Sequence, residues 1–308
     1  MIKSALFLVY GFYAWFLWPA VKWILRYLTG KCELLRLTTN HSKGAFRTTV
    51  VEQSIANSRC PQVRKALHWT DSFDYEGVTR DIITTKKIDT VEFPKFAFAA
   101  DFIYCLRQIH AYTRLISQVE LLKTTPFDSQ RKDHQDLLDK LWVSLSPVEN
   151  PSSDVRNWSL LGFQTDDNPG TDFRGMGLLS LENLVYFSAQ HTKLCKSLLS
   201  ASNHPRRWYP FAVVGINMTE MLYVQLKNGV LKNQFHNTSD CCTLVDFHKL
   251  FCFVFYSFHE YWMMCDRDIM QFRIHREQFR QNLEGRLRAV DCRLGLTGSN
   301  GDFSYFEL

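Results

Sequence analysis

The sequence predicts an all-α protein, and three observations point to this fold class. Beyond Gly30, apolar residues recur at helical spacing in several segments. Prolines, glycines and short polar residues separate these segments and mark where helices begin and end. No segment shows the sustained alternation of apolar and polar residues that predicts a strand. A chain of 308 residues is also long enough to bury a sizeable core without disulfide bonds.

Composition and charge exclude several broad classes of protein. The nine cysteines form no CxxC pair and have no repeated spacing, which favours free thiols in a reducing compartment over a disulfide framework. The formal net charge is +5 and is not concentrated in one block, so we expect no nucleic-acid partner. This mild positive charge is better matched to an acidic membrane surface or an acidic protein.

Residues 1–28 are predicted to form a hydrophobic, membrane-associating segment. The run from Ser4 to Val21 has no charged residue and is rich in Phe, Trp, Tyr and Leu. As a helix it would reach roughly 27 Å, close to the thickness of a thin bilayer core. Lys22 and Arg26 follow this run, so the tendency of basic residues to stay inside places the bulk of the chain in the cytosol.

Three alternatives remain open for this segment. It can span a bilayer, it can lie in the headgroup region, or it can be a helix buried in the protein's own core. The many aromatic residues between Phe7 and Trp18 suit the headgroup region. A cleaved signal peptide is disfavoured, because Trp18-Pro19-Ala20 is a poor small-residue cleavage site and the apolar-basic pattern continues to Leu28.

Residues 29–127 are expected to form an N-terminal helical region. Its most regular helix lies between Pro94 and Pro126, because proline is tolerated at the start of a helix but not in its interior. The apolar residues that recur at helical spacing in this segment are Phe102, Leu106, Ile109, Ile116 and Val119.

Residues 133–291 are expected to form the main helical domain. We expect Asp128 or Ser129 to cap its first helix and Pro147 to end it. The apolar face of this helix consists of Leu138, Leu141, Trp142 and Leu145. The segment between Pro210 and Gly229 is apolar on most faces, which predicts a central helix.

Two more helices and a tail complete this domain. The segment from Thr243 to Cys265 is strongly apolar, but its longest uncharged run is too short to span a membrane. The last helix carries one apolar and one basic side, formed by Ile269, Phe272, Phe279, Leu283 and Leu287 and by Arg273, Arg276 and Arg280. The basic side is interpreted as a solvated face, with a contact to anionic lipid or an acidic partner as the alternative. Residues 292–308 are expected to be a flexible tail.

The segment from Trp158 to Phe187 is the most informative part of the chain, because it places Arg174 in a polar turn between two apolar helical patterns. An arginine on such a short, constrained backbone can pin the surface, pair with a carboxylate or bind phosphate oxygens of a partner. Asp172 is close enough in sequence to orient Arg174. The residues of the turn that favour caps or unusual backbone angles are Asp166, Asp167, Asn168, Pro169, Gly170, Asp172, Gly175 and Gly177.

Motifs of self-contained chemistry are absent from the sequence. There is no GxxxxGK[ST] phosphate loop, no GxGxxG turn, no GxSxG elbow and no HExxH pair. The histidines do not pair with cysteines at zinc-ligand spacing, so we expect no metal site and no cofactor. His248 and His259, which lie among phenylalanines, are interpreted as core or boundary residues.

Several motifs resemble the signature of the ELMO domain family. The central one consists of Trp158-x3-Gly162-Phe163-Gln164, then Pro169-Gly170-Thr171-Asp172-Phe173-Arg174-Gly175-x-Gly177, then the apolar run to Phe187. Flanking segments also resemble the short ELMO domain-containing proteins, and they are Thr29 to Leu34, Asn203-His204-Pro205 and Val214 to Met221. The resemblance extends along nearly the whole chain.

The resemblance implies a function as well as a helical ELMO domain. It implies GTPase-activating activity toward Arf-like and related Arf-family GTPases, as an activator in trans with no catalysis of its own on small molecules. The arginine matching Arg174 is the residue required for activation in that family, as an arginine finger. The remaining motif residues are the implied contacts to the partner: Trp158, Gly162, Phe163, Gln164, Pro169, Thr171, Asp172, Phe173, Gly175 and Gly177.

The implied partners are a GTP-bound small GTPase and membrane lipids, the latter bound through residues 4–28. The expected location is the cytosolic face of an intracellular membrane, either the endoplasmic reticulum or a lipid droplet, alongside a cytosolic pool. A distant alternative is a membrane tether that engages no GTPase.

The sequence departs from the family pattern at one point. Four residues, Thr165 to Asn168, separate Gln164 from Pro169 where the family usually has three, and Thr165 replaces a usual glycine. The extra residue either displaces Arg174 beyond the roughly 1 Å that catalysis tolerates or bulges outward without effect. The second hypothesis is therefore a non-catalytic adaptor, in which Arg174 anchors a small GTPase or a membrane partner by affinity alone.

Overall fold

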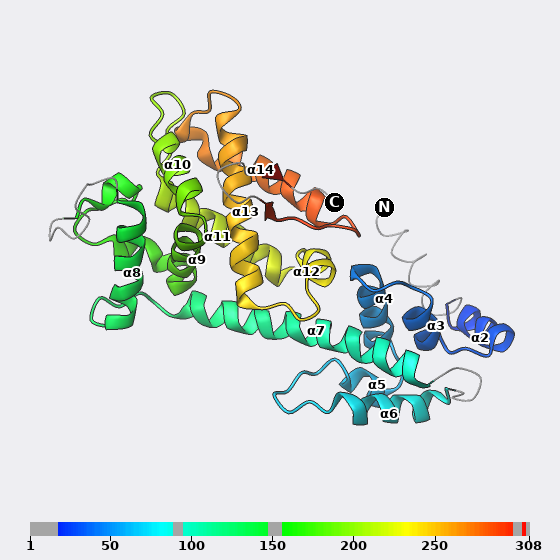
Figure 1. Cartoon of the computed structure of the whole chain (residues 1–308). Helices are drawn as coiled ribbons and strands as arrows, with labels where there is room; N and C mark the ends of the chain where they lie inside the picture. Colours follow the sequence, from blue (N-terminus) through cyan, green and yellow to red (C-terminus); the bar gives the residue numbers. More distant parts are fainter. Residues whose placement is uncertain (1–17, 89–94, 147–155, 298–303, 306–308) are drawn as a thin grey trace, which may run out of the picture. The chain divides into compact units, whose positions relative to one another are not determined.

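A computed structural model describes residues 18–88, 95–146, 156–297 and 304–305 of the chain. These residues are almost entirely helical, which confirms the predicted all-α class (Figure 1). Most of the predicted membrane-associating segment, residues 1–17, lies outside the described part. Within the described part, no helix is both long enough and apolar enough to cross a membrane. The chain divides by its internal contacts into two units, residues 1–110 and residues 111–308.

The first unit is a set of helices around a small apolar core. Its helices are α2 (Trp18–Thr29), α3 (Glu33–Thr39), α4 (Ala45–Ala56), α5 (Pro61–Lys65), α6 (Tyr75–Lys86) and the first half of α7 (Lys95–Thr124). Asp74 begins α6 by accepting a hydrogen bond from Gly77 N at 2.8 Å. The core includes Leu34, Leu35, Val51, Ile55, Val63, Ile82, Phe98, Phe102 and Leu106.

Helix α2 is fastened to this unit by its basic side chains. Lys22 forms a salt bridge of 2.6 Å with Glu33, and Arg26 donates a hydrogen bond of 2.9 Å to Lys86 O. The two basic residues that follow the predicted membrane-associating run are thus engaged within the protein. The apolar residues of α2 are largely exposed instead, and they include Trp23, Ile24, Tyr27 and Leu28.

The second unit contains the helices that the sequence predicts as the main domain. They are α8 (Lys132–Leu145), η2 (Trp158–Leu161), η3 (Pro169–Gly175), α9 (Gly177–Gln190), α10 (Thr192–Ser202), α11 (Phe211–Lys227), α12 (Lys232–Thr238), α13 (Leu244–Met263), η4 (Ile269–Gln271) and α14 (Phe272–Leu287). Helix α9 is central, since it packs against α8, α10, α11 and α13 (Figure 1). Helices α11 and α13 supply most of the aromatic and aliphatic core residues that pack against α9.

Most helix ends follow the sequence signals. Helix α7 lies between Pro94 and Pro126 as predicted, and α11 follows Pro210 and stops before Gly229, whose φ is +74°. Helix α13 starts with a reciprocal capping box, in which the side chains of Thr243 and Asp246 each bind the other's backbone N–H.

The predicted cap of α8 is wrong. The helix begins at Lys132, and its N-cap, Arg131, makes no side-chain capping bond. The side chain of Asp128 accepts from Gln130 N, so this residue closes the turn before the helix. Asp128 N donates to His134 Nδ1 at 3.0 Å, and this bond from the first turn of α8 displaces the expected cap.

The residues that follow α14, up to Leu294, pack within the second unit. Gln234 holds Leu294 at both backbone groups, with Nε2 2.8 Å from its carbonyl oxygen and Oε1 2.7 Å from its N–H. Cys292 and Leu294 are buried, so packing continues into the predicted tail 292–308. Two-residue strands, β1 (Leu296–Thr297) and β2 (Ser304–Tyr305), pair antiparallel there. The pair is too short to leave an alternating pattern in the sequence.

Candidate functional site

The candidate site is built on the short helix η3, a 3-10 helix that begins with Pro169. In this type of helix, side chains three residues apart lie on the same side. Gly170, Phe173 and Met176 therefore share one side, and Thr171 and Arg174 share another. Phe173 and Met176 are buried, whereas Thr171 and Arg174 are exposed. The period of the helix thus directs Arg174 toward solvent.

A row of aromatic rings holds the inner side of η3. Phe173 contacts Phe127 at 5.9 Å and Phe163 at 5.7 Å between ring centroids. Phe163 meets Trp158 edge to face at 5.5 Å, and Trp158 lies 5.1 Å from Trp142 of α8. Such aromatic pairs contribute about 0.5–1.5 kcal/mol each beyond their buried area. The backbone that carries Arg174 is therefore fixed from below by packed rings.

Two glycines of the motif are required by close backbone contacts. Gly162 has a φ of +78°, and a Cβ there would lie 2.2 Å from Phe211 N. Gly177 has a φ of +52°, and a Cβ there would lie 2.4 Å from Thr125 O at the end of α7. These positions lie in the left-handed region and leave no space for a side chain. Both glycines let the loop pack directly on neighbouring backbone.

Carboxylates close the loop that precedes η3. Asp172 Oδ2 accepts a hydrogen bond from Gln164 N at 2.8 Å, and Asp166 Oδ1 accepts from Ser159 N at 2.6 Å. The expected contact between Asp172 and Arg174 is not formed, because the Asp172 carboxylate faces the backbone of Gln164. Asp172 therefore stabilises the loop and leaves the arginine to other partners.

Arg174 itself is exposed and nearly uncommitted. Its Nη1 donates to Thr171 O at 3.3 Å, and it forms no salt bridge with any residue that the structure describes. A guanidinium has five N–H donors in a planar fork, so most of its donors face solvent here. The side chain is available to an acceptor brought by another molecule.

The other predicted partner contacts fall into three groups. Trp158, Phe163, Pro169, Phe173 and Gly177 are buried; Gly162 and Asp172 are partly buried; Gln164, Thr171, Arg174 and Gly175 are exposed. The buried group supports the loop, and the exposed group is what a partner could reach. Gly175 has room for a side chain, since an added Cβ would meet no atom within 4 Å.

Comparison with known proteins places this site in a family. Residues 117–275, which include η3 and Arg174, match the model of the ELMO/CED-12 family. The chain belongs to the ELMO/CED-12 family. It is 39% identical over 289 residues to human ELMO domain-containing protein 2, covering 93% of this chain and 96% of that protein. The resemblance deduced from the motifs is thus confirmed.

Other relatives extend the similarity over most of the chain. ELMO domain-containing protein 1 of Pongo abelii is 38% identical over 305 residues, which cover 92% of both chains. ELMO domain-containing protein B of Dictyostelium discoideum is 31% identical over 275 residues, which cover 86% of this chain and 93% of that protein. The similarity therefore includes helices outside the ELMO match.

The stretch in which the sequence predicts an extra residue is exposed. All residues from Gln164 to Asn168 are exposed, while Pro169 directly after them is buried. Thr165 Oγ1 donates to Asn168 O at 3.2 Å, which closes the stretch on itself. The added length is thus accommodated in the solvent-facing part of the loop, upstream of the packed helix.

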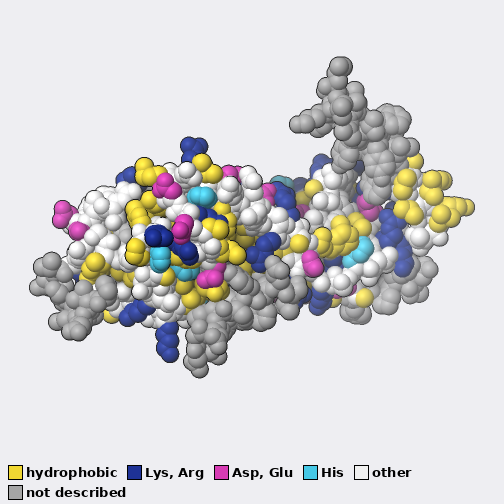
Figure 2. Space-filling view, turned by 90° about the horizontal axis from the view of Figure 1, so that it is seen from above, with side chains coloured by type: hydrophobic (Ala, Val, Ile, Leu, Met, Phe, Trp, Pro, Cys, Tyr) yellow, Lys and Arg dark blue, Asp and Glu magenta, His cyan; other side chains and the backbone are white. Residues whose placement is uncertain are grey.

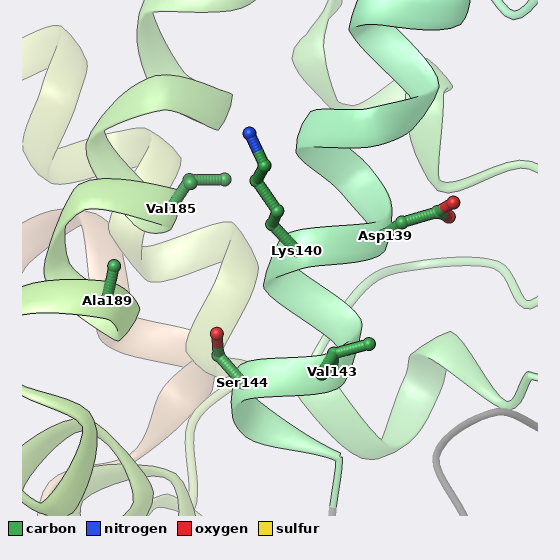
Figure 3. A pocket seen from close by; sticks show the side chains of 6 residues that line it. All are labelled: Asp139, Lys140, Val143, Ser144, Val185 and Ala189. Atoms are coloured by element: carbon green, nitrogen blue, oxygen red, sulfur yellow. The ribbon is translucent and has the colours of Figure 1, made fainter.

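Sequence patterns did not reveal a shallow groove between α8 and α9 (Figure 3). Its volume is about 330 Å³, and its lining residues are Asp139, Lys140, Val143, Ser144, Val185 and Ala189. Val143 is an exposed apolar residue on the otherwise polar outer face of α8. Its position is the one feature of the sequence that could have indicated the groove. Asp139 is occupied by a salt bridge to Arg156.

Buried polar groups of the ELMO domain are structural. Asn183 donates to Thr219 Oγ1 at 3.0 Å, and its Oδ1 lies 2.7 Å from His248 Nδ1. This leaves Nδ1 of His248 as the donor, so the ring is the neutral Nδ1–H tautomer. Burial lowers the pKa of His248 to about 4. The prediction that His248 and His259 are core residues is confirmed, and the described residues hold no cluster of metal-binding side chains.

Proposed function

We propose that this chain accelerates GTP hydrolysis by an Arf-like or related Arf-family GTPase, with Arg174 as an arginine finger. The observation that carries the proposal is the state of Arg174, which is exposed and free of any carboxylate among the described residues, on a backbone held by Phe173. An arginine with a purely structural role at the surface would be expected to form a salt bridge with a carboxylate. Membership of the ELMO/CED-12 family supports the same assignment.

The chemistry requires little else from this chain. The GTPase supplies the phosphate-binding loop and Mg²⁺, and the arginine neutralises charge that develops on the transferring phosphoryl group. Such a finger is worth about 10³ to 10⁵ in rate, which corresponds to about 4–7 kcal/mol. Because the finger acts only when its fork reaches two oxygens, a rigid platform matters as much as the charge.

The test is single-turnover GTP hydrolysis by a panel of Arf-like and Arf GTPases with the full chain in lipid or detergent. Arg174→Ala should reduce the stimulated rate by about 10³-fold or more, and Arg174→Lys should recover little because an ammonium cannot bind in a bidentate way. Arg293→Ala, at another exposed arginine of the same unit, is the matched control. All variants should keep the wild-type melting temperature.

An adaptor is the second candidate function, because an exposed Arg174 held by one internal hydrogen bond can also anchor a partner by affinity alone. An adaptor would bind a GTPase in its GTP form while the wild type failed to stimulate hydrolysis, and Arg174→Ala would then weaken binding. Stimulation that survives Arg174→Ala would contradict both roles of the arginine.

Membrane association through residues 4–28 is part of the proposal. The exposed apolar residues Trp23, Tyr27 and Leu28 of α2 support it, since Trp and Tyr favour the headgroup region of a bilayer. The proposed location is the cytosolic face of the endoplasmic reticulum or a lipid droplet.

A further inference from the structure

An exposed apolar cluster lies at the end of the second unit where two turns and the start of α14 meet. Its exposed fractions are 50% for Trp208, 77% for Met264, 87% for Met270 and 57% for Ile274. Single exposed apolar residues are common and need no explanation. Four large ones on adjoining segments form a surface, which we call the apical surface.

Hydrogen bonds and ring contacts fasten these segments to one another. Arg207 donates to Met263 O and to Asp266, each at 2.6 Å, and Trp262 Nε1 donates to Arg207 O at 2.9 Å. Trp262 also contacts the ring of Phe272 at the start of α14, at 5.9 Å. Both turns lie at the top of the second unit in Figure 1, and the view from above in Figure 2 shows hydrophobic side chains there beside Lys and Arg.

The charges around the apical surface are predominantly positive. Arg206 and Arg273 are exposed and form no salt bridge with described residues. The two exposed acids of these segments keep their negative charge, although Asp266 pairs with Arg207 and Asp268 accepts a hydrogen bond from Met270 N at 2.9 Å. The arginines of the same segments, Arg206, Arg207, Arg267 and Arg273, outnumber them, so the net charge that a partner meets is positive. The other two arginines of the predicted basic stripe pair with carboxylates and do not add to it.

We infer that the apical surface binds an anionic membrane surface. Trp and Met side chains on turns can enter the headgroup boundary, while Arg206 and Arg273 meet lipid phosphates. A membrane is favoured over a protein partner because the exposed Trp and Met side chains stand beside Arg206 and Arg273, which form no salt bridge with described residues. This contact is separate from α2 and does not depend on the role of Arg174.

Hydrogen exchange of the full chain with vesicles tests this inference, because it reports on each segment separately. Amides of residues 203–210 and 262–275 should exchange several-fold more slowly with vesicles that contain phosphatidylserine than with phosphatidylcholine alone. Protection at α2 without protection of these two segments would overturn the inference. So would equal protection by neutral and anionic vesicles, since the cationic rim would then have no role.

Two variants and a control make the test specific. Met264→Glu/Met270→Glu should abolish vesicle protection of both segments, and Arg206→Ala/Arg273→Ala should weaken it by about tenfold or more in vesicle concentration. Leu121→Glu/Val143→Glu adds the same charge at exposed apolar positions of the same unit and should leave protection unchanged. Equal loss in the control would show a general charge effect and overturn the assignment, as would retained protection in both apical variants.

Discussion

Surface arginines of this chain differ mainly in their partners. Arg280 binds Glu277 and Glu284, and Arg131 binds Asp133. Such exposed pairs contribute little to stability because solvent screens them. Arg174 has no such pair although it lies near several carboxylates. Two neighbouring acids, Asp166 and Asp172, accept hydrogen bonds from backbone N–H groups instead of from Arg174.

His259 gives a prediction at the residue scale. Burial lowers its pKa from 6.5 to about 4, and its Nδ1 lies 2.7 Å from Tyr209 OH. Between these pH values the unfolded chain binds more protons than the folded chain. The folded state therefore has its full stability, as far as His259 is concerned, above about pH 6.5. It loses stability as the pH falls toward 4, because only the unfolded chain takes up the proton in this range. His259→Asn should reduce the slope of stability against pH in this window by about 1.4 kcal/mol per pH unit.

Urea unfolding at several pH values between 4 and 7 measures this slope. His204→Asn makes the same exchange at an exposed position of the same unit and serves as the control. An unchanged slope in His259→Asn, with the same native fold by circular dichroism, would show that the buried imidazole does not control acid stability.

At the scale of elements, the junction between α7 and α9 depends on Gly177. Gly177→Ala should lower the free energy of unfolding by about 2 kcal/mol or more, since its Cβ would lie 2.4 Å from Thr125 O at a φ of +52°. Gly175→Ala is the matched control two residues earlier, where a Cβ meets nothing within 4 Å. Chemical unfolding of both variants measures the difference, and equal stabilities would refute a requirement for glycine at the junction.

The long helices could be predicted because residues next to each helix end determine where the helix begins or stops. Proline before α7 and α11, glycine after α11 and the capping box of α13 all act within a few residues. The cap of α8 was predicted wrongly, because the side chain of His134, six residues further along, binds Asp128 N in a way that no capping rule describes. Short helices such as α5 and α12 were also missed, since one or two turns leave too little periodicity.

The candidate site was predictable only in part. The glycines and proline around Arg174 indicate a constrained loop, and its exposure follows from that pattern. The partner of Asp172 is Gln164 N, eight residues away, and no local rule selects it over Arg174. The sequence also did not show which motif residues are buried. The motif match gives Trp158 and Phe163 as contacts to a partner, whereas both side chains are buried in the core.

At the scale of the whole molecule, the residues that the structure describes form two separate apolar cores. One contains Ile55 and the other Leu222, and both side chains are fully buried. Ile55→Ala and Leu222→Ala should each cost about 2–5 kcal/mol in the unit that contains the residue. Native-state hydrogen exchange should locate faster exchange to residues 18–110 in the first variant and to residues 111–294 in the second.

The two substitutions serve as controls for each other. If either one accelerated exchange equally in both units, the chain would unfold as a single cooperative body and the division into two cores would have no energetic meaning.

The three-residue period of η3 decides where this chain tolerates changes in length. One added residue inside the helix turns every later side chain by about 120°, which would carry Arg174 off the outer side and bring its neighbour there. One added before Pro169 changes only solvent-facing backbone. Insertions and deletions that survive selection should therefore accumulate between Gln164 and Pro169, and the interval from Pro169 to Gly177 should keep constant length among descendants of this gene.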